Sequence, residues 1–403
     1  MIERIIEWCA FHKILVFIGV LLLAIWAVDS LKKTPLDALP DLSDPQVIIF
    51  TDWMGRSPDL LEEQVTYPLV RTLQSTPGVR TVRGYSMFGM SFVYVIFKDK
   101  TDIYWARTRV VEQLDRAKQF LPPGVAPQLG PDATGIGWVF QYVIEDTSGR
   151  LDLAKLRELQ DFTIRPALQS VSGVAEVASL GGYERQFQVT IDPAKLASVG
   201  VTVGDITRAV KGANSEVGAR VIEMAGREYV LRGRGYVKSL AELEQSFVKL
   251  GAGGSAIRLR DVAVLQYGPE IRRGAADWNG QGEAVGGIVV MRIGSNALTV
   301  NQAIKEEIKR LSLPPGVKLV PSYDRSELIK GAIESLTGTL IQQGVIVSLI
   351  CLVFLFHARS ALVAMIILPL SVLLSFIAIR YLGLTANIMS LGGIAIAVGE
   401  LAD

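Results

Sequence analysis

The chain is poor in the side chains that most often bind metals or form disulfides, with two cysteines and two histidines in 403 residues. Cys9 and Cys351 lie at or inside apolar segments, and His12 and His357 lie beside apolar runs. The long polar middle of the chain therefore contains neither residue type. This excludes a disulfide framework in that region, and it excludes a histidine-based metal site there.

The sequence also lacks the motifs of the common enzyme classes. It has no GxSxG with partner residues, no phosphate-binding GxxxxGK[ST], no CxxC and no HExxH. The string Gly135–Gly137 is too short for a dinucleotide-binding fingerprint and is interpreted as a hinge. Asp41, Asp44 and Asp132 are interpreted as turn or cap residues. The net charge of +1, without a dense basic tract, argues against a nucleic-acid partner.

Hydrophobic residues are abundant instead. They make up 50% of the chain against 20% charged residues, a balance that indicates a mixture of membrane and water-exposed parts. Apolar runs at 14–28, 336–356, 361–379 and 387–403 predict four membrane helices. The first run lacks the cleavage site of a signal peptide, so we interpret it as an uncleaved anchor. The positive charges weakly favour a cytoplasmic N-terminus, with the long loop after the first helix outside.

That loop shows the order of a split βαβ, ferredoxin-like unit. Expected strands at 47–51, 80–86 and 91–97 alternate with helices that begin after Ser57 and at 103–120. The pattern LQSxxGVxxV occurs at 73–82 and 168–177, and LPPGV occurs at 121–125 and 313–317. Repeats of this kind predict at least two related α+β subdomains.

A glycine-rich stretch interrupts the second of these subdomains and predicts an inserted subdomain. The expected organisation is an N-terminal segment with the first membrane helix, a first α+β subdomain, a second α+β subdomain in two pieces, the insertion, and three membrane helices. The corresponding ranges are 1–31, 32–134, 135–179 with 268–330, 180–267 and 331–403.

The last stretch, NIMSLGGIAIAVGELAD, combines an apolar helix with two carboxylates. At 100° per residue Gly392, Gly399 and Asp403 share one face, with Glu400 about 60° away. Small residues such as these and Gly393 let another helix approach closely. An acid on the same stripe would cost roughly 2.5–3.5 kcal/mol if it faced lipid, so we interpret Asp403 as an ion or proton carrier. The alternative is that the helix ends at Glu400 and both acids are solvated.

Methionines are candidates for soft-metal ligands because thioether sulfur selects monovalent ions such as Cu(I). Met87 and Met90 flank the start of a strand, and Met389 begins the last helix. For Met87 and Met90 we favour apolar packing over metal binding. Met389 remains a candidate because of its position near a buried acid.

Several motifs together resemble the heavy-metal efflux class of resistance-nodulation-division (RND) transporters, and the resemblance covers all 403 residues. The wording of several of them, notably PDATG at 131–135 and LPDLSD at 39–44, is more similar to the silver/copper branch than to the zinc/cobalt one. The motifs are PLDALPDLSD at 35–44, VTYPL at 65–69, LGPDATG at 129–135, YDRS at 323–326, RSAL at 359–362 and NIMSLGGIAIAVG at 387–399.

The resemblance implies a membrane helical bundle with periplasmic ferredoxin-like porter subdomains and an inserted docking subdomain. It implies a proton-driven exporter of metal ions, not an enzyme, in the inner membrane. The expected partners are two further copies in a homotrimer, a periplasmic adaptor, an outer-membrane channel and the lipid bilayer. No permanently bound cofactor is expected. Asp403 matches the proton-relay acid, and Met389 matches a methionine of the metal path.

The sequence departs from the silver/copper branch at three positions. Leu401 and Ile271 stand where those members have methionine, and Glu400 is an additional acid. The ion therefore stays open between Cu(I) or Ag(I) and a divalent metal, with a drug exporter and a non-transporting membrane scaffold or sensor as further alternatives. We expect the chain to be one half of a longer transporter.

Overall fold

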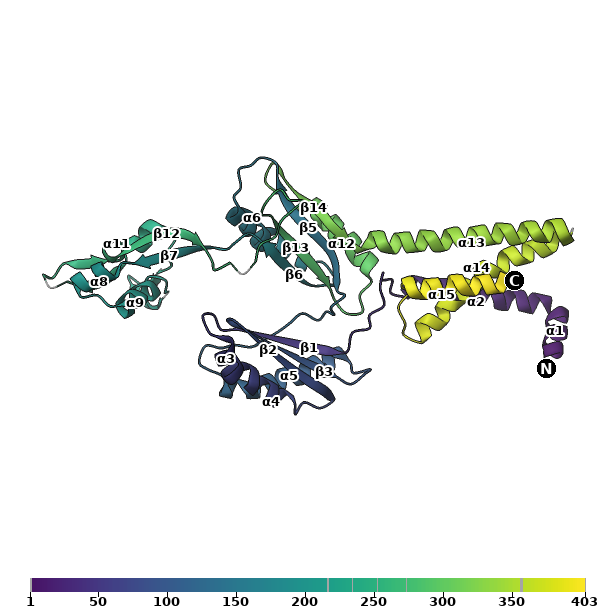
Figure 1. The fold of residues 1–403 in the computed structure, drawn as a ribbon, viewed down its shortest axis with the longest axis horizontal. Helices are drawn as coiled ribbons and strands as arrows, with labels where there is room; N and C mark the ends of the chain where they lie inside the picture. The colour runs from purple at the N-terminus through teal and green to yellow at the C-terminus, as the bar shows by residue number, and fades with distance from the viewer. Residues whose placement is uncertain are drawn as a thin grey trace. The chain divides into compact units, whose positions relative to one another are not determined.

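The computed structural model describes residues 2–215, 217–233, 235–251, 253–272, 274–355 and 358–402. Their contacts divide the chain into two compact units. The first comprises Met1–Ser148, Leu159–Leu180 and Gly286–Asp403, and the second comprises Gly149–Glu158 and Gly181–Val285. Figure 1 labels most of the helices and strands of both units.

The first sheet of unit 1 has the strand order β2-β3-β1-β4. Alternate residues of β1, and of β3 along most of its length, are buried, so one face of the sheet packs against helices. That core contains Val47 and Ile49 from β1, Val93 and Val95 from β3, and Leu69 from α4. The predicted strands and helices of this region are confirmed. The elements are β1 (Gln46–Asp52), α3 (Pro58–Leu61), η1 (Glu62–Thr66), α4 (Tyr67–Leu73), β2 (Val79–Met87), β3 (Met90–Phe97), α5 (Ile103–Ala117), η2 (Lys118–Phe120) and β4 (Gln128–Leu129).

The second sheet has the order β14-β5-β13-β6. If the four strands are ranked by their order along the chain, the sheet reads second, third, first, fourth from the β6 edge. The first sheet has the same order when it is read from β2. The predicted repeat is therefore a repeat of topology as well as of sequence. All residues of β13 are buried, so both faces of this central strand are covered. The elements are β5 (Trp138–Asp146), α6 (Leu153–Leu159), η3 (Gln160–Ile164), α7 (Arg165–Gln169), β6 (Val174–Gly181), β13 (Val285–Met291), α12 (Ala297–Arg310) and β14 (Val317–Asp324).

Unit 2 is built largely from the segment between β6 and β13. Its core includes Leu196, Ile206, Leu259 and Val262. The predicted insertion at 180–267 falls within this region, and the compact unit continues to Val285. The elements are β7 (Arg185–Ile191), α8 (Pro193–Val199), α9 (Val203–Ala213), β8 (Val217–Met224), β9 (Arg227–Gly233), α10 (Leu240–Glu244), β10 (Phe247–Leu250), β11 (Ala256–Arg258), α11 (Leu259–Val262) and β12 (Ala263–Pro269).

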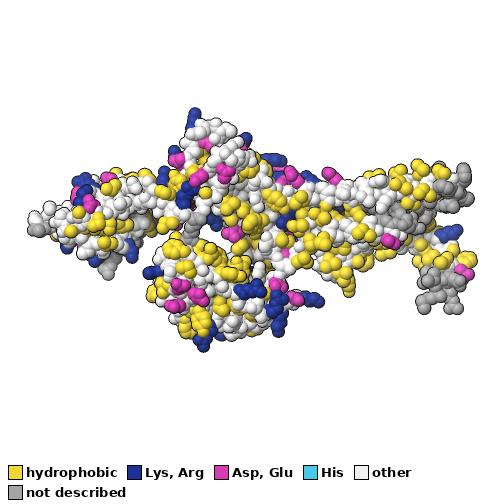
Figure 2. Space-filling model, viewed as in Figure 1, with side chains coloured by type: hydrophobic (Ala, Val, Ile, Leu, Met, Phe, Trp, Pro, Cys, Tyr) yellow, Lys and Arg dark blue, Asp and Glu magenta, His cyan; other side chains and the backbone are white. Residues whose placement is uncertain are grey.

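Five helices complete unit 1: α1 (Ile2–Phe11), α2 (Lys13–Lys33), α13 (Arg325–Leu355), α14 (Ala358–Tyr381) and α15 (Ile388–Ala402). Helix α14 packs against α2, α13 and α15, and α13 also packs against α15. Among the described residues, α2 is the one helix whose length and composition would let it cross a membrane. The membrane helices predicted at 336–356 and 361–379 overlap α13 and α14, so the helical structure predicted there is observed. Figure 2 shows hydrophobic side chains gathered over this helical part.

Candidate functional site

The predicted relay lies at the C-terminal end of α15. Glu400 is exposed, and Asp403 lies outside the described residues. Met389, near the other end of the helix, is 71% exposed. The structure therefore does not place Met389 beside Glu400, because the two residues lie towards opposite ends of α15 and each residue advances the helix by about 1.5 Å along its axis.

The face of α15 that packs against α14 carries large apolar side chains and not the predicted stripe of glycines. Leu391 is buried and Ile394 packs against Val372 and Phe376 of α14. A Cβ atom added at Gly392 or Gly393 would meet nothing within 4 Å. Gly399 belongs to the same helix. The close helix approach expected at Gly392 and Gly393 is thus not made by the described residues, and at all three glycines it stays a prediction.

The start of α15 is hydrogen-bonded to the segment that follows α2. The Ala386 N–H donates to the Pro35 carbonyl at 3.0 Å, the Asp37 N–H donates to Ala386 at 3.0 Å, and the Ile388 N–H donates to Ala38 at 3.2 Å. Leu36 and Ala386 form a parallel bridge. This places part of the PLDALPDLSD motif against the NIMS motif, so two motifs far apart in sequence form one local structure.

The same segment carries a buried ion pair. Arg325, the first residue of α13, places its guanidinium 3.2 Å from the Asp37 carboxylate, and the two side chains are 4% and 12% exposed. Burial raises the pKa of Asp37 above its ordinary value, and the Arg325 guanidinium acts in the opposite direction. The Ala297 N–H at the start of α12 donates to the Leu36 carbonyl at 3.2 Å. Helices α12, α13 and α15 are therefore all joined to residues 35–38.

Asp324, which precedes Arg325, is the centre of a second polar network. One of its oxygens accepts hydrogen bonds from the Asn301 amide at 3.0 Å and from the Ser326 N–H at 2.9 Å and hydroxyl at 2.6 Å. Lys305 of α12 forms an ion pair with its other oxygen. Burial opposes ionisation of Asp324, but the hydrogen bonds from Lys305 and Ser326 outweigh it and hold its pKa below the ordinary value.

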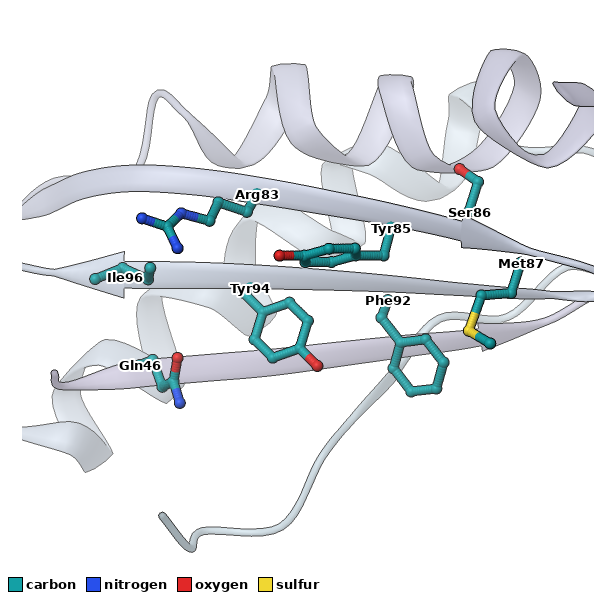
Figure 3. Close-up of a pocket in the computed structure, with 8 residues that line it drawn as sticks. All are labelled: Gln46, Arg83, Tyr85, Ser86, Met87, Phe92, Tyr94 and Ile96. Carbon is teal, nitrogen blue, oxygen red and sulfur yellow. The ribbon is translucent and has the colours of Figure 1, made fainter. Parts of the chain in front are cut away.

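A cavity of about 580 Å³ lies on the face of the first sheet that is not covered by helices (Figure 3). Tyr85 and Tyr94 meet edge to face across it, with ring centroids 5.5 Å apart. The lining is mostly aromatic and apolar with one cation. It consists of Gln46, Arg83, Tyr85, Ser86, Met87, Phe92, Tyr94 and Ile96.

The comparisons with known proteins agree with these motifs. The model of the AcrB/AcrD/AcrF family matches residues 5–403. The chain belongs to this family. This AcrB-family chain is 49% identical over 405 residues to the cation efflux system protein CusA of Escherichia coli (strain K12), and 48% identical to the putative cation efflux system protein SilA of Salmonella typhimurium. Each alignment covers 100% of the chain and 39% of the relative.

A more distant relative is the cobalt-zinc-cadmium resistance protein CzcA of Cupriavidus metallidurans, 37% identical over 98% of the chain and 38% of that protein. Among solved structures, an X-ray crystal structure of a heavy metal efflux pump matches with a TM-score of 0.86 and 30% identity, over 97% of this chain and 39% of that one. The recognition of the N-terminal part of a heavy-metal RND transporter is confirmed. The chain spans about two fifths of the length of these relatives.

The sequence alone did not single out Asp37, Asp324 or Arg325 as interacting residues. A signal was present, since all three lie in motifs that carry the resemblance, PLDALPDLSD and YDRS. The pairing of Asp37 with Arg325 was not visible in the sequence, because the two residues are 288 positions apart.

Proposed function

We propose that the full-length protein exports heavy-metal cations, Cu(I) or Ag(I), in exchange for protons. It would act in the inner membrane as a homotrimer, joined by a periplasmic adaptor and an outer-membrane channel. The observation that carries the proposal is the 48–49% identity to CusA and SilA along the whole chain, against 37% to CzcA.

The helical part of unit 1 supports a place in the membrane. Helix α2 is apolar along its length, with large side chains exposed on many sides, among them Ile14, Phe17, Leu21 and Trp26. Exposed apolar surface of this extent indicates contact with lipid or with other apolar helices. In this proposal α13, α14 and α15 join α2 in a membrane bundle.

Protonation of Asp403 would drive the cycle, with Glu400 as a second acid of the relay and Met389 on the metal path. A membrane potential of 100 mV supplies roughly 2.3 kcal/mol per charge moved, and each unit of pH difference adds about 1.4 kcal/mol. A shift of α15 would be transmitted to α12 and α13 through residues 35–38, because those residues are bonded to all three helices.

Export of divalent metals is the second candidate. It is favoured by the identity to CzcA and by Leu401 and Ile271, which carry no sulfur at two positions where the silver/copper branch has methionine. Ile271 is 74% exposed, so its side chain is not required for the core of unit 2.

Metal tolerance of cells tests both candidates. The full-length gene would be expressed, with its adaptor and outer-membrane channel, in cells that lack their own copper and silver exporters. We expect higher tolerance to silver and copper, less cell-associated metal, and unchanged tolerance to zinc, cobalt and a panel of drugs. Tolerance to zinc and cobalt alone would favour the second candidate, and no gain for any metal would contradict both.

A further inference from the structure

Two methionines face each other at the end of the β2–β3 hairpin. The strands are joined by Phe88 and Gly89, and Met87 pairs directly with Met90 in the register. Gly89 adopts a positive φ of 69°, which this tight turn requires. Directly opposite residues of antiparallel strands point to the same face, with Cβ atoms about 4.5–5.5 Å apart. Two thioether side chains therefore start from neighbouring positions on one face.

The buried core of the subdomain does not include this pair. Met87 is 55% exposed and Met90 is half-buried. The core of the subdomain is on the other face, where Ser86 and Ser91 hydrogen-bond to Thr66 at 2.8 and 2.7 Å. Met87 is thus outside that core, and the apolar packing that the sequence favoured for Met87 and Met90 stays a prediction.

A carboxylate continues the row. Asp52, the last residue of β1, pairs directly with Met90 from the opposite side and is exposed. Hydrogen bonds fix the end of the hairpin on that side, since the Trp53 N–H donates to Gly89 at 2.9 Å and the Gly89 N–H donates to Arg56 at 3.0 Å. Met87, Met90 and Asp52 therefore lie side by side across three strands, which are spaced about 4.8 Å apart.

Aromatic rings line the same face beside Met87. Figure 3 shows the Met87 thioether beside the Phe92 ring, at the end of the cavity. Ring faces attract cations. The one cation of the cavity lining, Arg83, lies four residues from Met87 along β2, which is about 13 Å of extended strand. Arg83 therefore lies well away from the methionine end of this face.

We propose that Met87 and Met90 bind one soft monovalent cation, Cu(I) or Ag(I), with Asp52 offsetting its charge. Thioether sulfur is a neutral, soft ligand that selects such ions over zinc and other harder divalent ions. Among the described residues there is no group of three or more His, Cys, Asp or Glu side chains that could hold a metal ion. The site would take up cargo on the first ferredoxin-like subdomain, away from Met389. The choice of ion rests on the proposed function, but the site itself does not.

Silver binding to the purified full-length protein tests the site. The number of Ag(I) ions bound per chain would be measured by equilibrium dialysis and by calorimetry, for wild type and for M87L/M90L. Leucine keeps the volume and apolarity of methionine but removes the sulfur. We expect the double variant to bind one Ag(I) fewer per chain, and D52N to keep the ion about fivefold more weakly, as expected for losing one nearby charge in water.

The second hairpin of the chain offers a matched control. Met224 is 59% exposed and also precedes a two-residue loop, but it pairs with Arg227. M224L should leave the number of bound Ag(I) ions unchanged. Equal binding by wild type and M87L/M90L, or displacement of this silver by Zn(II), would overturn the site. Either result would be independent of export, which the tolerance of cells measures separately.

Discussion

Arg325 and Asp37 form an ion pair that is nearly closed to solvent, with side chains that are 4% and 12% exposed, respectively. Removing one partner of such a pair leaves a buried charge without compensation, which costs about 3–5 kcal/mol, whereas removing both costs much less. Because burial already raises the pKa of Asp37, a lone Asp37 can lower this cost by taking up a proton. The pair therefore matters for how α13 is joined to residues 35–38 more than for net stability.

We predict that Arg325→Met destabilises the protein by about 3 kcal/mol, and that adding Asp37→Asn restores part of the loss. Thermal unfolding of the full-length protein in detergent would measure both. The exposed pair Lys318–Glu145, with side chains 58% and 31% exposed, is the control, and Lys318→Met should change stability by less than about 1 kcal/mol. Additive losses in the double variant would contradict the pairing.

Asp324 gives a prediction about pH. Its pKa is held below the ordinary value of 3.8 by Lys305 and Ser326, against the effect of burial. A carboxyl group with a lowered pKa in the folded state adds stability above its unfolded pKa, and this contribution is lost as the pH falls through the folded pKa. Asp324→Asn should therefore be less stable than wild type at pH 7, with the difference shrinking below about pH 4.

The measurement is the unfolding temperature from pH 7 to pH 3 for wild type, Asp324→Asn and Asp99→Asn. Asp99 is 82% exposed, so its substitution should leave the profile of wild type almost unchanged. A constant difference between wild type and Asp324→Asn over the whole range would show that the ionised carboxylate does not stabilise the fold.

At the scale of elements, strand β2 and the η1 turn approach each other closely at Gly84. A Cβ atom there would lie 2.5 Å from the Thr66 methyl carbon and 3.0 Å from a Val70 methyl carbon. Thr66 cannot turn aside freely, because its hydroxyl is hydrogen-bonded to both Ser86 and Ser91. The absence of a side chain at Gly84 thus sets the distance between sheet and helix.

Gly84→Ala should destabilise the first subdomain by about 1–3 kcal/mol, the usual cost of overpacking. Gly212 in α9 is a matched control, since a Cβ atom there meets nothing within 4 Å, and alanine should be neutral or stabilising by up to about 1 kcal/mol. Denaturant or thermal unfolding measures both changes. If Gly84→Ala unfolds like wild type, the close approach does not constrain this subdomain.

The elements were the most predictable level. Local sequence patterns were enough to predict them, and the structure confirms the predicted strands and helices. The patterns were the alternation in Ser91–Phe97, the helix cap at Ser57 and the repeats at 73–82 and 168–177. Helix α13 begins at Arg325, eleven residues before the predicted span, because its first turns contain Glu327, Lys330 and Glu334 and give no hydropathy signal. Pairings such as Leu36 with Ala386 could not be predicted, since nothing local encodes contacts between distant segments.

For the whole molecule, the connections of residues 35–38 suggest how α15 and the second sheet domain are coupled. The start of α15 is bonded to Pro35, Asp37 and Ala38, and Leu36 is bonded to Ala297 at the start of α12. Motion of α15 along its axis would thus pull on α12 without a separate connecting element. The sequence predicted a role for the carboxylates Glu400 and Asp403. It did not predict this link, because the link is made by backbone groups.

The proposed relay gives the final prediction, because its two acids, Glu400 and Asp403, should differ in importance. Asp403, on the glycine face, would carry the proton, so Asp403→Asn in the full-length protein should abolish silver export, since asparagine cannot change its charge. Glu400 is exposed among the described residues, so Glu400→Gln should retain most export. Silver efflux from loaded cells would be measured, with trimer assembly checked by size-exclusion chromatography. Full export by Asp403→Asn would remove it from the relay, and loss of export in Glu400→Gln alone would assign the proton to Glu400.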